Sequence, residues 1–404
     1  MTRVVLAYSG GLDTSVAVRW LMDRYQLEVV TLTADLGGDI DLEAARQKAL
    51  QVGAVDAFVV DAREQFVHDF VLPALQADAL YEGTYPLATA LARPLIAQLM
   101  VDVARRTGAS LIAHGCTGKG NDQVRFDVAT TALAPDLKVI APIREWRMSR
   151  EEEIVYAHQH GIPVPVDLGS PYSTDENLWG RSAECGVLED ASAEPPEDAY
   201  AWTASPQAAL DEPLYLEIDF EEGVPVALDG VRMDLLPMVE RLNMLAGRYG
   251  VGRIDMIENR LVGLKSREIY EAPAAVVLHA AHRAVEDLTL AKDSLRFKEV
   301  VSSTYSDLIY NGLWFGALRR DLAAYVASSQ QHVTGAVRLK LYKGSCVVVG
   351  RQSPFSLYDQ ELATYGGGDT FDYQAAEGFI ALWGLPLRTQ ARKQTLQVTT
   401  VPSA

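Results

Sequence analysis

The sequence predicts an α/β protein with a doubly wound, mainly parallel sheet, followed by an α+β region and a helical tail. Three observations support this prediction. Apolar, strand-like runs alternate with helical patterns through residues 4–142, which is typical of a parallel sheet with helices on both faces. An alternating pattern at 337–350 turns at Lys343-Gly344, so it predicts an antiparallel hairpin. An amphipathic helical segment follows at 373–385.

Strands and helices are expected to alternate in the first region. The expected strands span residues 4–8, 28–34, 56–61, 110–115 and 138–142. The expected helices between them span residues 12–24, 42–52, 64–80 and 94–107. Gly53 and Gly108 stand where helices are expected to end, because glycine readily adopts the conformation of a helix C-terminus. In a Rossmann-like sheet of this kind, ligands bind beyond the carboxyl ends of the strands.

The stretch VVLAYSGGLDTS, residues 4–15, joins the first expected strand to the first helix. A tight turn with a capped helix is one interpretation. We prefer an anion site, because unpaired N–H groups at a helix start favour phosphate. The loop lacks the lysine of G-x-x-x-x-G-K-[ST], and it does not match G-x-G-x-x-G. It therefore suits a nucleotide whose pyrophosphate leaves, as in adenylation, better than one whose terminal phosphoryl group is transferred.

Two more polar segments, 34–38 and 114–123, also follow expected strands. Carboxyl ends of parallel strands meet at one edge of a sheet, so these segments and the first loop are expected to converge there. Structural turns alone do not require such convergence. The sequence therefore predicts a ligand site at this edge.

A domain boundary is expected at the sequence IPVP, residues 162–165. It follows a helix that opens on a capping box of Ser149 and Glu152 and ends near Gly161. The stretch 189–213 is acidic and is interpreted as a solvated surface connection.

The rest of the chain is expected to form an α+β region and a tail. A strand is expected at 214–220, and helices are expected at 234–247 and 273–290. The expected domains span residues 1–165, 166–365 and 366–404.

Composition and charge exclude several classes of function. The net charge is −18, which argues against a nucleic-acid-binding protein, because such a protein needs a basic surface. No apolar run approaches membrane-spanning length and no export signal is expected. The cysteines, Cys116, Cys185 and Cys346, are far apart, which fits a reduced cytoplasmic setting. The histidines show no metal spacing, so no protein-bound metal site is expected.

Several segments together resemble the argininosuccinate synthase family in order and spacing. They are AYSGGLDTS (7–15), YEGTYPLATALARP (81–94), HGCTGKGNDQVRF (114–126), PYSTDENLWGRSAECGVLED (171–190) and GRIDMIENRLVGLKSREIYEAP (252–273). The first segment alone indicates only the wider superfamily of N-type ATP pyrophosphatases, which share the SGGxD[ST] loop. The GKGNDQVRF and ENRLVGLKSR segments narrow the resemblance to this family, and it covers nearly the whole chain.

The resemblance implies an ATP-dependent carbon–nitrogen ligase of arginine biosynthesis. Citrulline's ureido oxygen would attack the α-phosphorus of ATP to give citrullyl-AMP and pyrophosphate. Aspartate would then displace AMP to form argininosuccinate. Mg²⁺ is expected with ATP, because it neutralises charge on the departing pyrophosphate. The resemblance also implies a synthetase and multimerisation domain at 166–365, an oligomerisation tail at 366–404, and a homotetramer.

Residue roles follow by resemblance. The expected ATP contacts are Ala7, Tyr8, Ser9, Gly10, Gly11, Leu12, Asp13, Thr14, Ser15, Ala34 and Gly115. Ser9 is expected to be catalytic, because its hydroxyl would meet charge that develops on the phosphates. Asp13 is a second catalytic candidate that would assist Mg²⁺, although capping of the helix is an equal alternative. Ala34 could also be a plain strand end.

The other two substrates share one segment. Thr117, Asn121 and Asp122 are expected to contact aspartate, with Asp122 as a catalytic acceptor for the amino group; an Asx-rich turn is the alternative. The expected citrulline contacts are Tyr85, Thr89, Ala90, Asn121, Arg125, Ser173, Ser182, Glu258 and Tyr270. The planar fork of Arg125 suits a carboxylate, and Glu258, expected just after a strand at 253–257, suits an α-amino group.

Some features leave alternatives open. The family usually shows Thr-Ser where this chain has Thr89-Ala90, so the contact there is expected from the backbone or from Thr89. Cys116 beside His114 is a weak nucleophile candidate and is interpreted as a packing residue. Another ATP pyrophosphatase, acting on tRNA, would need a basic surface or paired cysteines. A nucleotide sensor without turnover would leave the polar positions in 171–270 unexplained.

Overall fold

The computed structural model describes residues 2–146, 148–164, 171–366 and 370–394. The chain forms two compact units, Met1–Phe355 and Ser356–Ala404. In the part of the chain that the structure describes, no helix is both long and apolar enough to cross a membrane.

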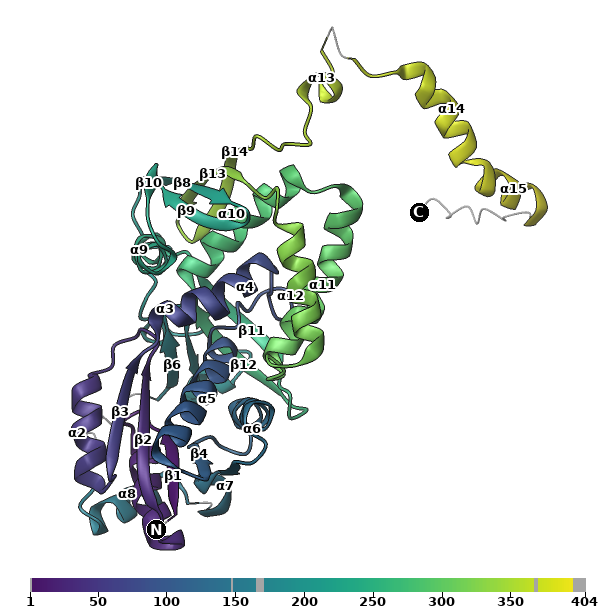
Figure 1. The fold of residues 1–404 in the computed structure, drawn as a ribbon. Helices are drawn as coiled ribbons and strands as arrows, with labels where there is room; N and C mark the ends of the chain where they lie inside the picture. Colours follow the sequence, from purple (N-terminus) through teal and green to yellow (C-terminus); the bar gives the residue numbers. More distant parts are fainter. Residues whose placement is uncertain (1, 147, 165–170, 367–369, 395–404) are drawn as a thin grey trace, which may run out of the picture. The chain divides into compact units, whose positions relative to one another are not determined.

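The first part of the larger unit is a parallel sheet of five strands in the order β3-β2-β1-β4-β5 (Figure 1). The strands are β1 (Arg3–Ala7), β2 (Glu28–Asp35), β3 (Asp56–Asp61), β4 (Leu111–Ala113) and β5 (Lys138–Ile140). The order places β1 at the centre, so the loop after β1 lies between the ends of β2 and β4. This confirms the predicted doubly wound sheet.

Helices cover both faces of this sheet. They are α1 (Leu12–Tyr25), α2 (Leu42–Val52), α5 (Ala88–Thr107), α6 (Asp122–Leu133), α7 (Pro142–Trp146) and α8 (Arg150–Gln159). The alternation along β1 separates two cores: Val4 and Leu6 pack in the cluster that contains α1, whereas Val5 packs in the cluster that contains α5. Burial on both faces explains why β1 is apolar throughout its centre.

Two expected helices differ from the observed ones. The expected helix 64–80 is α3 (Arg63–Gln65), a π-helical turn (Phe66–Val71) and α4 (Leu72–Gln76), and it ends before Asp78, whose φ is 51°. Helix α5 begins at Ala88 rather than at Pro94, which lies inside it. Burial of the apolar side chains in the turn before Pro94 stabilises the helix there and offsets the loss of the backbone hydrogen bond that proline cannot donate.

The second part of the larger unit contains two antiparallel sheets. One has the order β11-β12-β7-β6, and the other has the order β10-β9-β8-β13-β14. The strands of the first sheet are β6 (Ser173–Asn177), β7 (Gly180–Glu184), β11 (Arg253–Asn259) and β12 (Lys265–Glu271). The strands of the second sheet are β8 (Leu214–Glu221), β9 (Val224–Leu228), β10 (Val231–Arg232), β13 (Gly335–Tyr342) and β14 (Ser345–Gln352).

The predicted hairpin is β13–β14, and it turns at Lys343 and Gly344, whose φ values are 46° and 87°. The helices of this part are α9 (Leu235–Arg248), α10 (Pro273–Thr289), α11 (Lys292–Tyr310) and α12 (Ala317–Ser329). Short 3₁₀ turns span Gly186–Glu189 and Glu197–Ala199. One expectation was wrong: Glu258 lies within β11, not after it, because the strand continues to Asn259.

The smaller unit contains α13 (Gln360–Ala363), α14 (Tyr373–Trp383) and α15 (Leu385–Gln394). The predicted amphipathic segment 373–385 is α14 together with the first residue of α15. Asp372 caps α14 by accepting hydrogen bonds from the N–H groups of Gln374 and Ala375.

Candidate active site

A cavity of about 230 Å³ lies beyond the carboxyl ends of β1, β2 and β4. Of the residues expected to contact ATP, those that line it are Ala7, Tyr8, Ser9, Thr14, Ala34 and Gly115. The three loops that were expected to converge on this edge therefore do so. Arg93, Asp175 and Glu176 also line the cavity, and Arg93 is its single Arg or Lys residue among those described.

The loop after β1 leaves the start of α1 without a side-chain cap. The N-cap residue is Gly11, and the structure gives no side chain that accepts from the first N–H groups of the helix among the described residues. Ser9 Oγ lies 3.2 Å from Thr14 Oγ1 and accepts a hydrogen bond of 3.4 Å from Gly11 N. Ser9 and Thr14 line the cavity beside the uncapped helix start, an arrangement that suits phosphate, whereas the expected contacts Gly10 and Gly11 are not among the lining residues.

Ser15 has a different position from Ser9 and Thr14. Its side chain is fully buried, donates to Gly11 O at 2.6 Å and lies 2.9 Å from the Tyr8 hydroxyl. Its hydroxyl therefore holds the loop from within. Leu12 likewise packs in the core with α1. Neither residue is among those that line the cavity.

Asp13, in the first turn of α1, is paired with a residue of α8. Its Oδ1 accepts from Arg150 Nη1 at 3.0 Å, and it does not cap α1. Burial and then the neighbouring Asp13 carboxylate raise the pKa of Glu153 to about 8. Asp13 thus joins α1 to α8, and it is not among the residues that line the cavity.

A second, smaller cavity of about 110 Å³ lies beside the first. The residues expected to contact citrulline or aspartate that line it are Tyr85, Thr89, Asn121, Asp122, Arg125, Ser182, Glu258 and Tyr270. These residues come from four parts of the chain, and the structure brings them to one place. Asp175 lines both cavities, so it forms part of the wall between them.

Glu258 is the centre of a buried hydrogen-bond network. Its Oε2 accepts from the Tyr270 hydroxyl and its Oε1 from the Tyr310 hydroxyl, both at 2.7 Å. Tyr270 stacks on Tyr85 with ring centroids 4.1 Å apart, and the Tyr85 hydroxyl accepts from Thr89 N at 3.0 Å. The acid is therefore held by two phenols at one side of the cavity.

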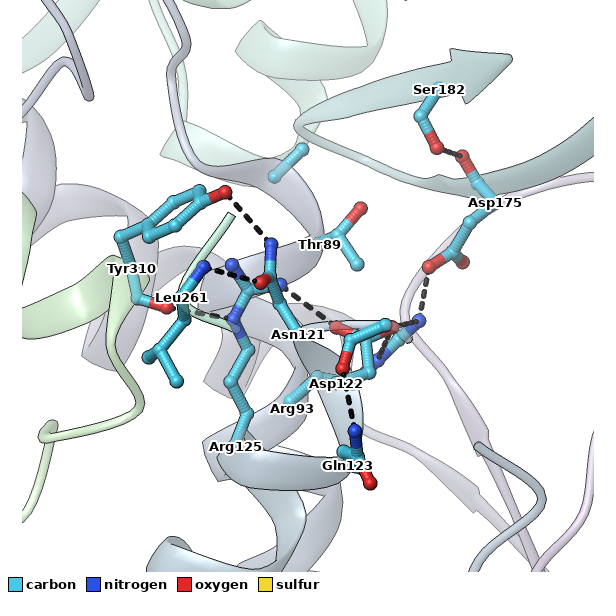
Figure 2. Close-up of polar contacts among 12 residues, drawn as sticks. Thr89, Arg93, Asn121, Asp122, Gln123, Arg125, Asp175, Ser182, Leu261 and Tyr310 are labelled. Carbon is cyan, nitrogen blue, oxygen red and sulfur yellow. Dashed lines mark hydrogen bonds and ion pairs between the residues drawn. The ribbon is translucent and has the colours of Figure 1, made fainter. Parts of the chain in front are cut away.

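Asn121 connects this network to the loop after β4. Its Nδ2 donates to the Tyr310 hydroxyl at 2.8 Å, and its Oδ1 accepts from Leu261 N at 2.9 Å (Figure 2). Both polar atoms of the side chain are thus engaged with the protein, and Asn121 fixes the walls of the cavity.

Arg125 and Asp122 form a buried pair at the other side. Arg125 donates from Nε to Tyr310 O at 2.9 Å and from Nη1 to Asp122 Oδ1 at 2.8 Å (Figure 2). Its guanidinium lies 4.9 Å from the centre of the Tyr310 ring, and its side chain is 4% exposed. Within the described part of the chain, no hydrogen bond uses Nη2, which leaves this nitrogen for a ligand.

Arg93 bridges two carboxylates at the wall between the cavities. Its Nε and Nη2 donate to Asp122 Oδ2 at 3.0 and 2.8 Å, and Nη2 also donates to Asp175 Oδ2 (Figure 2). Burial opposes ionisation of Asp122, but Arg93 and Arg125 together lower its pKa. Asp122 is therefore an ionised acceptor, and it is poorly suited to be a general base.

Three expected substrate contacts do not line the second cavity. Ala90 is fully buried in α5, so it offers no contact to a ligand. Thr89 lines the cavity, and of this pair of residues it alone brings a hydroxyl there. Ser173 is exposed at the start of β6. Thr117 is exposed, and its carbonyl accepts from Gly120 N at 3.3 Å.

Cys116 lines the first cavity but lacks a base. The His114 Nδ1 accepts from Cys116 N at 3.2 Å, and the His114 Nε2 lies 2.8 Å from Asp127 Oδ1, so neither nitrogen faces the thiol. Burial raises the pKa of the Cys116 thiol well above its usual range. These contacts support a packing role.

Sequence reasoning missed several polar residues of this site. Arg93 lies in the quoted segment YEGTYPLATALARP and Asp175 in PYSTDENLWGRSAECGVLED, yet neither was assigned a role. A charged side chain inside each of these segments was the signal that could have identified Arg93 and Asp175 as site residues. Glu268 and Arg260 also line the second cavity; burial and then Glu184 raise the pKa of Glu268 to about 7. Tyr310 comes from an unpredicted helix, and no local pattern marked it.

Comparisons with known proteins cover almost the whole chain. The Arginosuccinate synthase N-terminal HUP domain family matches residues 3–163, and the Arginosuccinate synthase C-terminal domain family matches residues 172–390. The chain is 58% identical over 394 residues to argininosuccinate synthase of Dehalococcoides mccartyi, which covers 98% of this chain and 97% of the relative. It is 60% identical over 391 residues to that of Gloeobacter violaceus, which covers 96% and 98%. It is 57% identical over 393 residues to that of Symbiobacterium thermophilum, which covers 97% and 98%.

Proposed function

The chain belongs to the argininosuccinate synthase family of ATP-dependent ligases in arginine biosynthesis, and on this premise we propose how its two cavities divide the substrates. ATP occupies the cavity beyond β1, with its phosphates at Ser9, Thr14 and the start of α1. Citrulline occupies the cavity lined by Arg125 and Glu258. The full-length match leaves no reason to retain the interpretations of a tRNA-directed enzyme or a sensor.

The observation that carries this proposal is the shared wall of the two cavities. Asp175 lines both, and Arg93 binds Asp175 and Asp122 across the boundary. A reaction between ATP and citrulline needs the α-phosphorus and the ureido oxygen to meet, and this wall is where the two ligands come nearest. The arrangement therefore supports direct attack without a covalent enzyme intermediate.

In the first step, a lone pair of the ureido oxygen forms a bond to the α-phosphorus. The bond between that phosphorus and the bridging oxygen breaks, and its electron pair leaves with pyrophosphate. The ureido carbon of citrullyl-AMP then carries a good leaving group. The N–H groups at the start of α1 and the Ser9 hydroxyl are placed to bind the phosphate oxygens as charge shifts to pyrophosphate.

In the second step, the amino nitrogen of aspartate attacks the ureido carbon. The carbon–oxygen bond breaks, AMP leaves with the electron pair, and the nitrogen loses a proton. The segment Thr117 to Asp122 is the proposed aspartate site. The exposed Thr117 is free to contact a carboxylate, whereas the Asn121 and Asp122 side chains are already held by Tyr310, Leu261 and two arginines and would position the segment.

We also propose that ATP is used with Mg²⁺, which supplies charge neutralisation on pyrophosphate when bound. No group of three His, Cys, Asp or Glu residues in the described ranges could hold a metal by itself. Mg²⁺ usually binds through phosphates, water and one or two carboxylates, so such a group is not required. Glu176 lines the ATP cavity and is the carboxylate that would suit this role, whereas Asp13 is held by Arg150 and does not line the cavity.

Assembly is proposed from the exposed tail. In α14, Phe379, Leu382 and Trp383 are 61%, 72% and 76% exposed, and apolar surface of this kind is typical of an interaction site. The domain division at 1–165, 166–365 and 366–404 remains part of this proposal, with the last segment joining subunits of a homotetramer. A cytoplasmic location fits the free cysteines of the described chain.

Isotope labelling tests the proposed chemistry. Citrulline that carries heavy oxygen in its ureido group should transfer the label to AMP and leave pyrophosphate unlabelled, as mass spectrometry would show. Pyrophosphate release should require ATP and citrulline. Unlabelled AMP would exclude the adenylate, and ADP as the product would exclude the proposed use of the loop after β1.

A further inference from the structure

The loop after β1 lacks a lysine of its own, but a lysine from another helix touches it. Lys48 lies on α2, and its Nζ donates to Gly10 O at 2.8 Å. Its side chain is half-buried. A Cβ added at Gly10, whose φ is +79°, would lie only 3.3 Å from Ala45 Cβ one turn earlier on α2. Helix α2 therefore packs closely against the outer side of the loop.

The charge of Lys48 is not neutralised by a neighbouring acid. Among the described residues, no carboxylate forms an ion pair with its ammonium, although most other basic residues near the sheet have one. Burial lowers the pKa of Lys48, so the protein holds this cation where water stabilises it less. Its sole hydrogen-bond partner in the described chain is the loop carbonyl, so its charge acts on the loop.

The hydrogen bond from Lys48 to Gly10 O also affects the opposite side of the loop, where Gly11 N–H lies. The Gly10 carbonyl and the Gly11 N–H belong to one trans peptide unit, so they point in opposite directions. The Gly11 N–H points toward Ser9, a residue that lines the ATP cavity. A cation bound to the carbonyl polarises the peptide and strengthens its N–H as a donor. The positive charge also lies next to the residue that precedes the N-cap of α1.

We propose that Lys48 is a positioning residue for the phosphates of ATP. It orients and polarises the Gly10–Gly11 peptide and supplies, from the back of the loop, the positive charge that the loop sequence lacks. Lys48 need not touch the nucleotide. The inference rests on the proposed position of ATP in the cavity beyond β1.

The test compares three substitutions by direct binding of Mg-ATP, measured by calorimetry without citrulline or aspartate. K48M removes donor and charge, and it should raise the dissociation constant for ATP roughly tenfold, the order expected when a positive charge about 10 Å from a phosphate is lost at an effective dielectric constant of about 20. K48R keeps both and should bind ATP nearly as well as the wild type. K48Q keeps a donor without charge and should fall between them.

Arg46→Met is the matched control, because Arg46 lies on the same helix, pairs with Glu43 and has a side chain that is 40% exposed. It should leave ATP binding unchanged. K48M that binds ATP like the wild type would overturn the proposal. K48R that is as weak as K48M would show that the exact shape of lysine, and not its charge, matters. If K48M proves unfolded in a thermal scan, the comparison of K48Q with K48R decides. Equal affinities of these two variants for ATP would refute a role for the charge.

The readout separates this inference from the proposed function. Wild-type protein that binds ATP but shows no pyrophosphate release with citrulline and aspartate would contradict the proposed function. The ranking of the Lys48 variants in ATP binding would still decide the role of Lys48. Loss of citrulline binding in proportion to loss of ATP binding would indicate general damage to the fold and would count against the proposal.

Discussion

Replacement of Arg125 by lysine should separate the fit of a guanidinium from its charge. Arg125 makes two directed hydrogen bonds, to Tyr310 O at 2.9 Å and to Asp122 Oδ1 at 2.8 Å, and keeps Nη2 for a ligand. A single ammonium can retain the ion pair with Asp122, but it cannot reach the Tyr310 carbonyl and a ligand carboxylate at the same time. Arg125→Lys therefore preserves the charge and removes the geometry.

The size of the effect follows from these contacts. Loss of the buried bond to Tyr310 O should lower the free energy of unfolding by about 1.5–3 kcal/mol, the range for hydrogen bonds to charged groups. Loss of the proposed Nη2 contact to citrulline should raise the Michaelis constant for citrulline roughly ten- to a hundredfold, since each tenfold change is about 1.4 kcal/mol. The Michaelis constant for ATP should change little, because Arg125 does not line the ATP cavity.

Pyrophosphate release at saturating ATP and aspartate, with citrulline varied, measures the effect. Thermal unfolding of the same samples measures the loss of stability. Arg105→Lys is the control, because Arg105 pairs with Asp136 on the surface and is 51% exposed. A variant that is less stable yet has an unchanged Michaelis constant for citrulline would show that Arg125 only supports the fold, and the assigned citrulline site would be refuted.

Three other outcomes are expected. Ser9→Ala should slow formation of AMP roughly a hundredfold or more by removing a donor to the phosphates, and rapid-quench measurement of labelled ATP would show it; an unchanged rate would remove Ser9 from the site. Glu153 has a folded pKa of about 8, above its unfolded value near 4.5, so the folded state holds the extra proton and wild-type stability should fall as pH rises from about 4.5 to 8. Glu153→Gln should flatten this part of the pH profile of unfolding, and a profile parallel to the wild type would contradict the assignment. A chain cut before Gly366 should lose the tetramer in light scattering, whereas an unchanged mass would refute the role of the tail.

The parallel sheet could be predicted because its signals are local. Val4, Val5 and Leu6 are apolar and β-branched or bulky, and burial on both faces of the sheet requires this pattern. The glycines at 10 and 53 mark a turn and a helix end that the structure contains. Helix α12 was missed because Val326 is its one buried residue, which leaves little periodicity, whereas α11 was missed although it buries Val301, Tyr305 and Ile309 at helical spacing. Helix α6 was missed because the segment before it contains Gly115, Gly118 and Gly120, which suggested that the loop continued.

The site could be predicted only in part, for a related reason. Tyr85, Arg125 and Glu258 lie in recognisable segments, and the structure brings them to one cavity. The roles of Arg93 and Asp175 depend on a contact that spans 82 positions of sequence, and no local pattern contains it. Ser15 differs, because its motif suggested a ligand contact whereas its buried hydroxyl donates to Gly11 O of the loop.

The network around Glu258 also bears on when the enzyme becomes competent during its synthesis. Asn121, Glu258 and Tyr310 are joined by hydrogen bonds, although Asn121 and Tyr310 are 189 positions apart in sequence. Closing such a long loop is slow and entropically costly, so contacts of this kind form late in folding. The sheet and its β1 loop consist of early residues that can assemble while the ribosome is still translating. The proposed citrulline pocket needs Tyr310 of α11, so a nascent chain should assemble the sheet and its β1 loop well before this pocket is complete.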